Sequence, residues 1–500
     1  MHSDTSNTIP TLSGEVFDAL PESIRSYIRF LEATIEKQQI RIQQLEARVH
    51  DLETRLSKNS SNSSKPPSSD GLKKKKPKSQ REKSGKKSGG QQGHIGKTLT
   101  QVEKPDVIVT HTPSLCDGCG SGLGAVAGSC AERRQVFDIP QPKVEVTEHR
   151  VEEKKCPCCG VLNRAVFPQT VRGPVQYGER VQALTVYFAH QHFIPMDRLC
   201  QIFEDIFGIT FSPGTYANID ERLFEKLEPF EASLKIYLLA ARVLHFDETG
   251  MRCEKKLHWI HVASSQVATL YKIHAKRGQE AMNGAGILPE FKGTAVHDHW
   301  VPYFSYGQVI HALCNTHHLR ELTFIYEQEK EDWAKQMKDL LIFGKQEVEK
   351  YAEERALPGG VLEKLKQSYE QVISNGLKYH AQLTPLSKCK RGRPKQRDGK
   401  NLLDRLQEKR DCVLRFMYNF AVPFTNNQGE QDIRMVKLKQ KISGCFRTLR
   451  GGQIFCRIRS YISTARKQDW HIWDALADAI RGSPRLLIVD YTSISKTLTA

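Results

Sequence analysis

The chain has 500 residues, more than one hydrophobic core usually organises, so several domains are expected. Its 74 lysines and arginines outnumber 57 aspartates and glutamates, and the net charge of +17 favours a polyanionic partner, nucleic acid before an acidic membrane. The absence of an apolar run of about 18 residues and of a signal-peptide pattern argues against a membrane or secreted protein. The 13 cysteines include two CxxC pairs, which indicate a reducing cytoplasm and a metal site rather than a disulfide framework.

Residues 24–56 carry an uninterrupted heptad repeat of apolar side chains. Its a positions are Ile28, Ile35, Ile42, Val49 and Leu56, and its d positions are Ile24, Leu31, Gln38, Leu45 and Leu52. Mostly β-branched residues at a, with leucine prevailing at d, favour a parallel two-stranded coiled coil. A helix packed against its own domain would have no reason to keep so long a strict repeat. We therefore expect a homodimer or higher oligomer formed through this segment.

A linker follows at residues 58–105. Serine, proline, glycine and lysine dominate its first part and cannot bury a core, so it is expected to be disordered. Between Lys73 and Lys97 it holds ten lysines or arginines against one acid, Glu82. Such a run can be merely solvated or serve as a localisation signal. In so basic a protein, non-specific binding to phosphates is the better interpretation.

Two CxxC pairs, each followed by glycine, come next in the motifs CDGCG and CPCCG. Such knuckles let backbone amides fold round a thiolate while two sulfurs reach one tetrahedral zinc. We expect one structural zinc, held by Cys116, Cys119, Cys156 and Cys159, because four thiolates leave no open position for catalysis. Cys130 and Cys158 fall outside the pattern. The alternating segment KVEVTEHRVE between the pairs suits a hairpin.

Residues 171–235 have a helical pattern. The segment from Pro195 to Leu227 predicts one helix, a short turn at Gly208–Ile209, and a second helix capped by Ser212. This resembles a DNA-binding helix-turn-helix, but any two packed helices joined by a glycine turn have the same pattern. The sequence alone does not choose between these two interpretations.

From Val243 the pattern changes to short strands, at residues 243–252, 257–265, 268–274 and 293–304. Three consecutive strands and a fourth after a helical crossover predict a mixed α/β sheet. Asp247 and Asp298 are each expected at the end of an apolar strand, where an α/β sheet holds its reacting groups. Long, charged helical stretches follow over residues 319–420.

Glu430 begins another helical stretch, and Arg434, Lys437 and Lys441 share its face at i+4, i+7 and i+11. This arrangement alone could be an ordinary ladder of ion pairs. Together with two aspartates on adjacent strands, however, Glu430 would complete a three-carboxylate cluster. Such a cluster suits two hard cations, Mg²⁺ or Mn²⁺, because like charges repel without metal. The cationic face would then bind the DNA backbone.

The motifs HFDETG, VHDHW, CNTHHLREL and VPFTNNQGEQDIRMVKLKQKISGCFR resemble the transposases of insertion sequence family 66. The heptads, the segment NSSNSSKPPSSDG and the two knuckles also occur in that family's order, so the resemblance covers most of the chain. It implies an RNase H-like core with an Asp-Asp-Glu triad at Asp247, Asp298 and Glu430. It also implies a DNA contact by Lys437, seven residues after the glutamate. The chain departs from the family's common pattern at Gly429 and Gln431, where alanine and arginine are usual.

Several residues keep more than one interpretation. Glu248 is the rival of Asp247, but strand alternation points it to the other face, and it is expected to support the site together with Thr249. Cys314 and His317 form a CxxH step that some related transposases share. Packing in the core is at least as good an explanation of this step, and the pair is left out of the predicted metal site.

Other side chains near the triad have ordinary explanations. The histidines that flank the aspartates, His245, His297 and His299, are expected to be neutral hydrogen-bond partners. Asn426 and Asn427 are expected to cap the Glu430 helix. The motif KRGRPKQ, with Arg391 and Arg393, resembles a hook for an A·T minor groove, and a solvated loop explains it equally well.

The sequence thus predicts a multidomain α/β protein. The expected domains are a segment with the coiled coil (1–57), a basic linker (58–105), a zinc-binding domain (106–165), a helical region (166–235), an RNase H-like core (236–470) with a helical insertion (325–420), and a helical tail (471–500). We expect a cytoplasmic transposase that binds double-stranded DNA at element ends and target and catalyses cleavage and strand transfer. A regulatory DNA-binding derivative without catalysis and a nuclease that cuts without joining remain alternatives. Whether companion proteins of the same element take part is left open.

Overall fold

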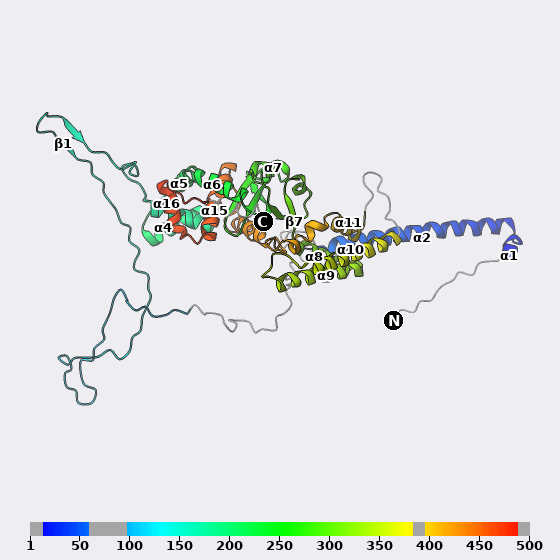
Figure 1. Cartoon of the computed structure of the whole chain (residues 1–500), viewed down its shortest axis with the longest axis horizontal. Helices are drawn as coiled ribbons and strands as arrows, with labels where there is room; N and C mark the ends of the chain where they lie inside the picture. Colours follow the sequence, from blue (N-terminus) through cyan, green and yellow to red (C-terminus); the bar gives the residue numbers. More distant parts are fainter. Residues whose placement is uncertain (1–13, 60–97, 384–395, 489–500) are drawn as a thin grey trace. The chain divides into compact units, whose positions relative to one another are not determined.

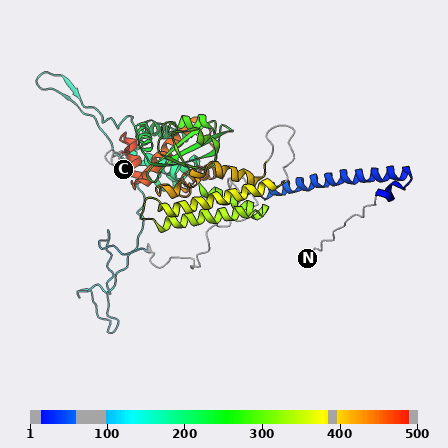
Figure 2. The same cartoon turned by 45° about the vertical axis from the view of Figure 1, so that its right-hand side comes forward.

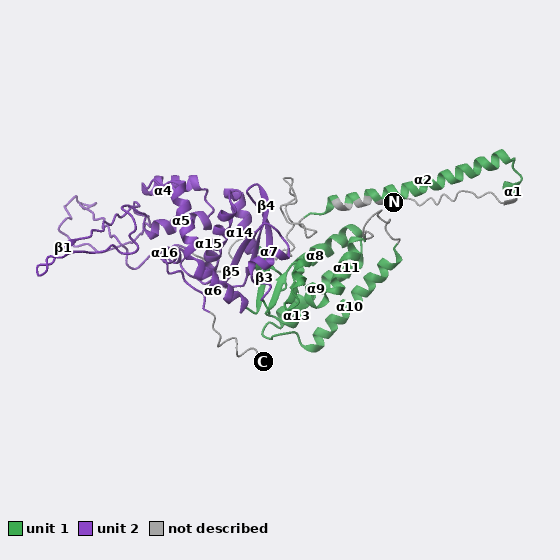
Figure 3. Ribbon diagram, turned by 90° about the horizontal axis from the view of Figure 1, so that it is seen from above, with its two compact units in different colours: residues 1–78, 241–247, 291–430 green, residues 79–240, 248–290, 431–500 purple. Residues whose placement is uncertain are grey.

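The computed structural model describes residues 14–59, 98–383 and 396–488 (Figure 1). The expected basic tract 73–97 and the expected hook at Arg391 and Arg393 therefore lie outside the described residues. The chain divides into two compact units, coloured in Figure 3. Unit 1 comprises residues 1–78, 241–247 and 291–430, and unit 2 comprises residues 79–240, 248–290 and 431–500. No helix in the described ranges combines the length and the apolar character that a membrane crossing requires.

A five-stranded mixed sheet has the strand order β5-β4-β3-β6-β7. Its strands are β3 (Val243–Cys253), β4 (Lys256–Ser264), β5 (Thr269–His274), β6 (Thr294–His297) and β7 (Ile310–Leu313). Strand β6 is parallel to both β3 and β7, whereas β4 and β5 are antiparallel. The prediction of a mixed sheet with a helical crossover, α7 (Gln279–Ala285), is confirmed. The fourth predicted strand is shorter than expected, and β7 was not predicted.

The expectation that Asp247 ends the first strand is wrong. Strand β3 continues to Cys253, and Asp247 is the fifth of its 11 residues. The chain reverses only at Glu254 and Lys255, whose φ angles of 51° and 64° are those of a two-residue hairpin turn. Such turns usually contain asparagine or glycine, so Glu-Lys gave no turn signal. Gly250 lies inside the strand, where a Cβ would meet Leu257 at 3.1 Å.

Unit 1 is built mainly from helices. They are α1 (Gly14–Asp18), α2 (Glu22–Ser57), α8 (Asn315–Phe324), α9 (Asp332–Lys350), α10 (Gly359–Gln382), α11 (Asp398–Glu408), α12 (Arg410–Val413) and α13 (Arg415–Tyr418), with the 3₁₀ helix η3 (Val301–Ser305) and the π-helix η4 (Ile325–Glu329). Helices α9 and α10 lie side by side (Figure 2). Their shared core includes Trp333, Met337 and Tyr369. A Cβ at Gly376 of α10 would come within 2.8 Å of Leu403, so glycine there permits close packing with α11.

The heptad segment forms a single helix. Helix α2 has 36 residues and is thus about 54 Å long. Its predicted seam is not covered within the described structure, since Ile35, Ile42 and Leu45 are 45%, 53% and 51% exposed. The helix is confirmed, and its pairing with a second chain remains a prediction.

Unit 2 contains the other helices and a small hairpin. The helices are α3 (Glu179–Val186), the π-helix η2 (Tyr187–Gln191), α4 (Met196–Phe207), α5 (Pro213–Lys226), α6 (Glu228–Leu239), α7, most of α14 (Asn427–Ser443), α15 (Leu449–Lys467) and α16 (Ile472–Arg481). Helix α15 covers β5, an edge strand of the sheet. Ser460 and Thr464 accept hydrogen bonds from the backbone N–H groups of Tyr271 and Thr269 at 2.9 and 3.1 Å. The helix therefore satisfies donors that an edge strand would otherwise expose.

The hairpin of the knuckle region lies elsewhere than predicted. Residues 143–152 of the alternating segment carry no strand. Instead β1 (Glu153–Lys155) and β2 (Leu162–Arg164) pair antiparallel on either side of the second knuckle. The reversal that joins them is the CxxCG motif itself, which the alternation of apolar and polar residues does not reveal.

Candidate functional site

The two predicted aspartates lie on neighbouring strands. Strand β3 pairs in parallel with β6 so that His245 is opposite Val296. Asp247 and Asp298 are each two residues further along, Asp298 directly after β6. The paired register ends at His245 and Val296, so both aspartates lie just beyond the paired residues of two strands whose usual spacing is about 5 Å. Both side chains are half-buried.

The third carboxylate, Glu430, lies in the first turn of helix α14 (Asn427–Ser443). Asn426, just before this helix, is buried and fixes where it begins. Its Nδ2 donates to the carbonyl of Phe246 at 2.7 Å, and its Oδ1 lies 2.8 Å from Nδ1 of His245. Its backbone carbonyl accepts from the N–H of Glu430 at 3.1 Å. The start of the helix is thereby tied to β3 immediately before Asp247.

The expected capping role of Asn426 is therefore only partly correct. The residue occupies the position before the helix, but its side chain bonds to β3 rather than to the first turn. Gly429 leaves room for this arrangement, because a Cβ there would lie 3.0 Å from Oδ1 of Asn426. Gly429, at the position where alanine is usual, thus lies against Asn426, the residue that positions the helix.

One compact group of metal-ligating side chains lies at this place. Donor atoms of Cys314, His317 and Glu430 are all within 4.8 Å of one another, and no other such group of three occurs in the described parts of the chain. Burial lowers the pKa of His317, but the hydrogen bond and charge of Cys314, together with the charges of Glu430 and Asp298, raise the pKa to about 9. The charges of Asp298 and Glu430 therefore both raise the pKa of the His317 imidazole.

Cys314 is held by backbone groups. Its thiol is buried and accepts a hydrogen bond from the backbone N–H of Asn426 at 3.1 Å. It also stands at the N-terminus of α8, and its own N–H donates to the carbonyl of His297 at 2.9 Å. Sequence reasoning left Cys314 and His317 out of the site and missed this role of Asn426. The CxxH step was the available signal for the first two.

The histidines beside Asp298 behave as expected of neutral hydrogen-bond partners. Burial lowers the pKa of His297 to about 3 and that of His299 to about 4. His297 Nε2 lies 2.9 Å from Nδ1 of His311. Oδ1 of Asp298 accepts the backbone N–H of Trp300 at 2.9 Å, which orients the carboxylate.

Glu248, the rival of Asp247, is bound by a cation. Arg277 donates to its Oε1 from Nη2 at 2.6 Å and from Nε at 3.0 Å, and the Glu248 side chain is 2% exposed. The guanidinium also lies over the Trp259 ring, 4.8 Å from its centroid. This pair anchors the strand residue that follows Asp247.

The residues of the predicted cationic face of α14 differ in how far they are exposed. Arg434 and Lys441 are exposed. Lys437 is half-buried, and its ammonium donates to the carbonyl of Gly250 at 2.7 Å. Burial lowers the pKa of Lys437. In this structure Lys437 therefore links α14 to β3, whereas the other two cations face solvent.

Both cysteine knuckles have the expected local geometry. Gly120 donates its N–H to the carbonyl of Cys116 at 2.8 Å, and Gly160 does so to Cys156 at 3.0 Å. Both glycines have a positive φ, 73° and 74°, which side chains rarely adopt. In the described residues, however, the sulfurs of the two knuckles are not brought together into one group within 4.8 Å.

The two helices of the predicted helix-turn-helix are α4 and α5. Gly208 ends α4 with a φ of 65°, and Ser212 Oγ accepts the N–H of Thr215 at 3.2 Å to begin α5, as expected. Phe203 and Phe211 pack edge to face between them, with ring centroids 5.0 Å apart. On α5 the exposed side chains include Asn218, Arg222 and Glu225, and on α4 they include Arg198, Glu204 and Asp205.

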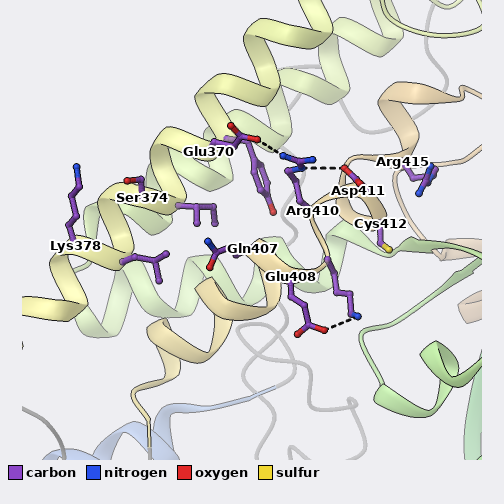
Figure 4. A pocket seen from close by; sticks show the side chains of 13 residues that line it. Glu370, Ser374, Lys378, Gln407, Glu408, Arg410, Asp411, Cys412 and Arg415 are labelled. Atoms are coloured by element: carbon purple, nitrogen blue, oxygen red, sulfur yellow. Dashed lines mark hydrogen bonds and ion pairs between the residues drawn. The ribbon is translucent and has the colours of Figure 1, made fainter. Parts of the chain in front are cut away.

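A separate pocket of about 740 Å³ lies in the helical part of unit 1, lined by residues of α10, α11 and α12 (Figure 4). Its charged side chains are largely paired with one another. Arg410 binds both Glu370 and Asp411, and Lys409 lies 2.8 Å from Glu408. The mixture of signs does not favour an anionic ligand, and no chemistry is assigned to this pocket.

Three family models match the chain. Residues 174–454 match the transposase IS66 family, and the match contains Asp247, Asp298 and Glu430. Residues 113–160 match the zinc-finger binding domain of transposase IS66, which contains all four knuckle cysteines. Residues 20–100 match a family of unknown function (DUF6444). No curated protein matches the chain significantly. Because the first match covers more than half of the sequence, the chain belongs to the transposase IS66 family.

Proposed function

We propose that this transposase binds the ends of a mobile insertion sequence, cleaves the DNA there, and joins the freed 3′ ends to target DNA. The observation that carries the proposal is the parallel pairing of β3 and β6, whose last pair, His245 and Val296, lies two residues before each aspartate. Asn426 supports it further by tying the start of the Glu430 helix to the same strand. We infer an RNase H-like core, with these three carboxylates as the catalytic residues.

The three carboxylates fit hard divalent cations. Their oxygens are the ligands that Mg²⁺ and Mn²⁺ prefer, and the half-buried side chains would repel one another without a counter-charge. Asp247, Asp298 and Glu430 would hold two such ions, which when bound activate the attacking oxygen and stabilise the leaving one. The chain's own part is positioning, by Asn426 at the helix start and by the N–H of Trp300 on Asp298.

DNA is proposed to bind along basic surfaces near this site. Arg434 and Lys441 are exposed on α14 and can neutralise phosphates. On α5, Asn218 and Arg222 face solvent at i and i+4, so they are the side chains of the helix-turn-helix that could reach base edges. Lys437 is proposed to act indirectly, by holding α14 against β3. Arg391 and Arg393, outside the described residues, remain proposed minor-groove contacts.

Two further parts are proposed to assemble the complex. Cys116, Cys119, Cys156 and Cys159 would bind one structural zinc, in a reducing cytoplasm that keeps the thiols free. Helix α2 would pair with that of a second chain through its exposed seam, giving a dimer or higher oligomer. A dimer presents two active sites to the two ends of one element. Companion proteins of the same element are further candidate partners.

The proposal is tested by incubating the purified chain with labelled element ends and a supercoiled plasmid, in Mg²⁺ or in EDTA. Labelled ends joined to the plasmid in Mg²⁺ alone are the expected result. Cleaved ends without joined product would instead indicate a nuclease. Binding of the ends without cleavage, also in the presence of the element's companion proteins, would indicate a regulatory DNA-binding protein.

A further inference from the structure

Cys314, His317 and Glu430 bring three different donor atoms to one place, a sulfur, a nitrogen and an oxygen, all within 4.8 Å of one another. Hard cations such as Mg²⁺ have little use for sulfur, whereas Zn²⁺ and Co²⁺ bind thiolate, imidazole and carboxylate alike. The donor set is therefore that of a transition-metal site rather than of a magnesium site.

The surroundings of Cys314 suit a sulfur bound to a metal ion. The backbone N–H of Asn426 donates to its sulfur at 3.1 Å, and Cys314 stands at the N-terminus of the ten-residue helix α8. Both features place positive partial charge beside the sulfur. Three protein ligands with an open fourth position are also the usual arrangement of a reactive zinc site, whereas structural sites use four.

His317 has a ring nitrogen to offer. Its Nδ1 is buried and has no hydrogen-bond partner among the residues that the structure describes. Buried polar atoms are almost always paired, so an unpaired nitrogen in a ring that belongs to this group points to a missing ligand. Donors on one tetrahedral zinc lie roughly 3–4 Å apart, so side-chain movements on the order of 1 Å would complete the site.

We propose that Cys314, His317 and Glu430 bind one zinc-like ion through sulfur, nitrogen and oxygen, with the fourth position open to water or a phosphate oxygen. The proposal deepens the proposed function at one point, because Glu430 serves both this ion and the carboxylate cluster. An ion bound here would use Glu430 together with the sulfur of Cys314. Because zinc binds sulfur and magnesium has little use for it, the site would discriminate between these two ions.

The test uses the full chain with its knuckles filled by zinc, one ion per chain, titrated with Co²⁺. We expect one further equivalent of Co²⁺ to bind, with the ultraviolet charge-transfer absorption of a sulfur–cobalt bond. Cys314→Ser should abolish this absorption, and His317→Gln should weaken Co²⁺ binding at least about tenfold, as loss of a ligand does. Cys412→Ser, a half-buried thiol elsewhere in unit 1, should change neither.

The outcomes separate cleanly. Absence of the absorption in the wild-type chain, its survival in Cys314→Ser, or unchanged Co²⁺ affinity in His317→Gln would each overturn the proposal. His317→Gln is a second variant in case Cys314→Ser fails to fold. Strand transfer in Mg²⁺ by a chain that shows no sulfur–cobalt absorption would leave the proposed function standing while this inference fails. If the absorption appears but the chain carries out no strand transfer, this inference stands while the proposed function fails.

Discussion

Asn426 is the residue on which the geometry of the candidate site depends most. Its side chain bonds to His245 and Phe246 of β3, its N–H to the sulfur of Cys314, and its carbonyl to Glu430. One residue thus connects a strand, the end of another strand and the start of a helix. Its side-chain partners lie about 180 residues away in sequence, which is why no local pattern indicated the role.

Replacing Asn426 should therefore destabilise the protein. Asn426→Ala removes one hydrogen-bond partner of the buried carbonyl of Phe246 and one of the His245 imidazole, which should cost about 1–3 kcal/mol of unfolding free energy. Asn427→Ala, at the next and exposed position, should change it by less than about 0.5 kcal/mol. Chemical denaturation of both variants measures the difference. Equal stabilities would show that Asn426 does not hold the helix start.

The lysines of α14 separate structural from DNA-binding roles. Lys437→Met removes the donor to Gly250 and should cost about 1–2 kcal/mol of stability. Lys441→Ala should leave stability unchanged, but should lower the slope of log affinity for DNA against log salt by about one. Denaturation and salt-dependent binding measure the two effects. If Lys437→Met instead lowers the slope of log affinity against log salt and leaves stability unchanged, Lys437 contacts DNA directly, as the family resemblance implied.

The residues of the proposed triad gave local signals in the sequence, but the residues that position them did not. Asp247 and Asp298 follow short apolar runs, and Glu430 opens a charged helix, so each gives a local signal. Cys314 and His317 gave only a CxxH spacing that core packing explains as well. Their proximity to Glu430 depends on a contact between segments more than 100 residues apart, which periodicity cannot reveal.

At the scale of elements, the strands were predicted better than their ends. Asp247 was wrongly placed at the end of the first strand, because the true reversal, Glu254–Lys255, lacks the residues typical of a turn. Strand β7 was missed because four residues are too few to show an alternation. Helix α15 begins at Leu449, before the glycines at 451 and 452, because Thr448 caps it and Gly452 packs against Ile273. Short strands and packing glycines are set by tertiary contacts.

Helix α2 offers a test of assembly with a matched control. Replacing both Ile35 and Ile42 with lysine would bury like charges at two a positions of the proposed seam. This double variant should therefore be monomeric. Ile40 is 49% exposed and lies outside the seam, so Ile40→Lys should leave the oligomer intact. Sedimentation velocity distinguishes the two. A monomeric wild-type chain, or a seam variant that sediments as the wild type does, would refute the coiled coil.

The cysteine knuckles allow an equally direct comparison. Cys116→Ser should release the one structural zinc and unfold its domain, since metal binding supplies the folding free energy of such small sites. Cys158 is exposed beside the second knuckle, and Cys158→Ser should retain the metal. Metal analysis in reducing buffer measures both. The four-cysteine assignment fails if the wild-type chain carries no zinc or if Cys116→Ser keeps its full content.

For the molecule as a whole, composition and order of motifs predicted the class of protein. The mixed α/β sheet, the long N-terminal helix, the knuckles and the helical stretches all occur in the order expected. The membership of the transposase IS66 family agrees with the resemblance read from the motifs. The assembly of the two knuckles and the pairing of α2 could not be predicted to the same degree, because both depend on a metal or a second chain.

Strand transfer by Glu430→Gln tests the central claim most directly. This change removes a charge but keeps the size of the side chain, so folding and binding of element ends should survive. Cleavage and joining in Mg²⁺ should fall by a factor on the order of 10³ or more, as for other members of a catalytic unit. Gln431→Ala, at the next and exposed position of α14, should transfer normally. Strand transfer by Glu430→Gln at the wild-type rate would contradict the assignment of the active site.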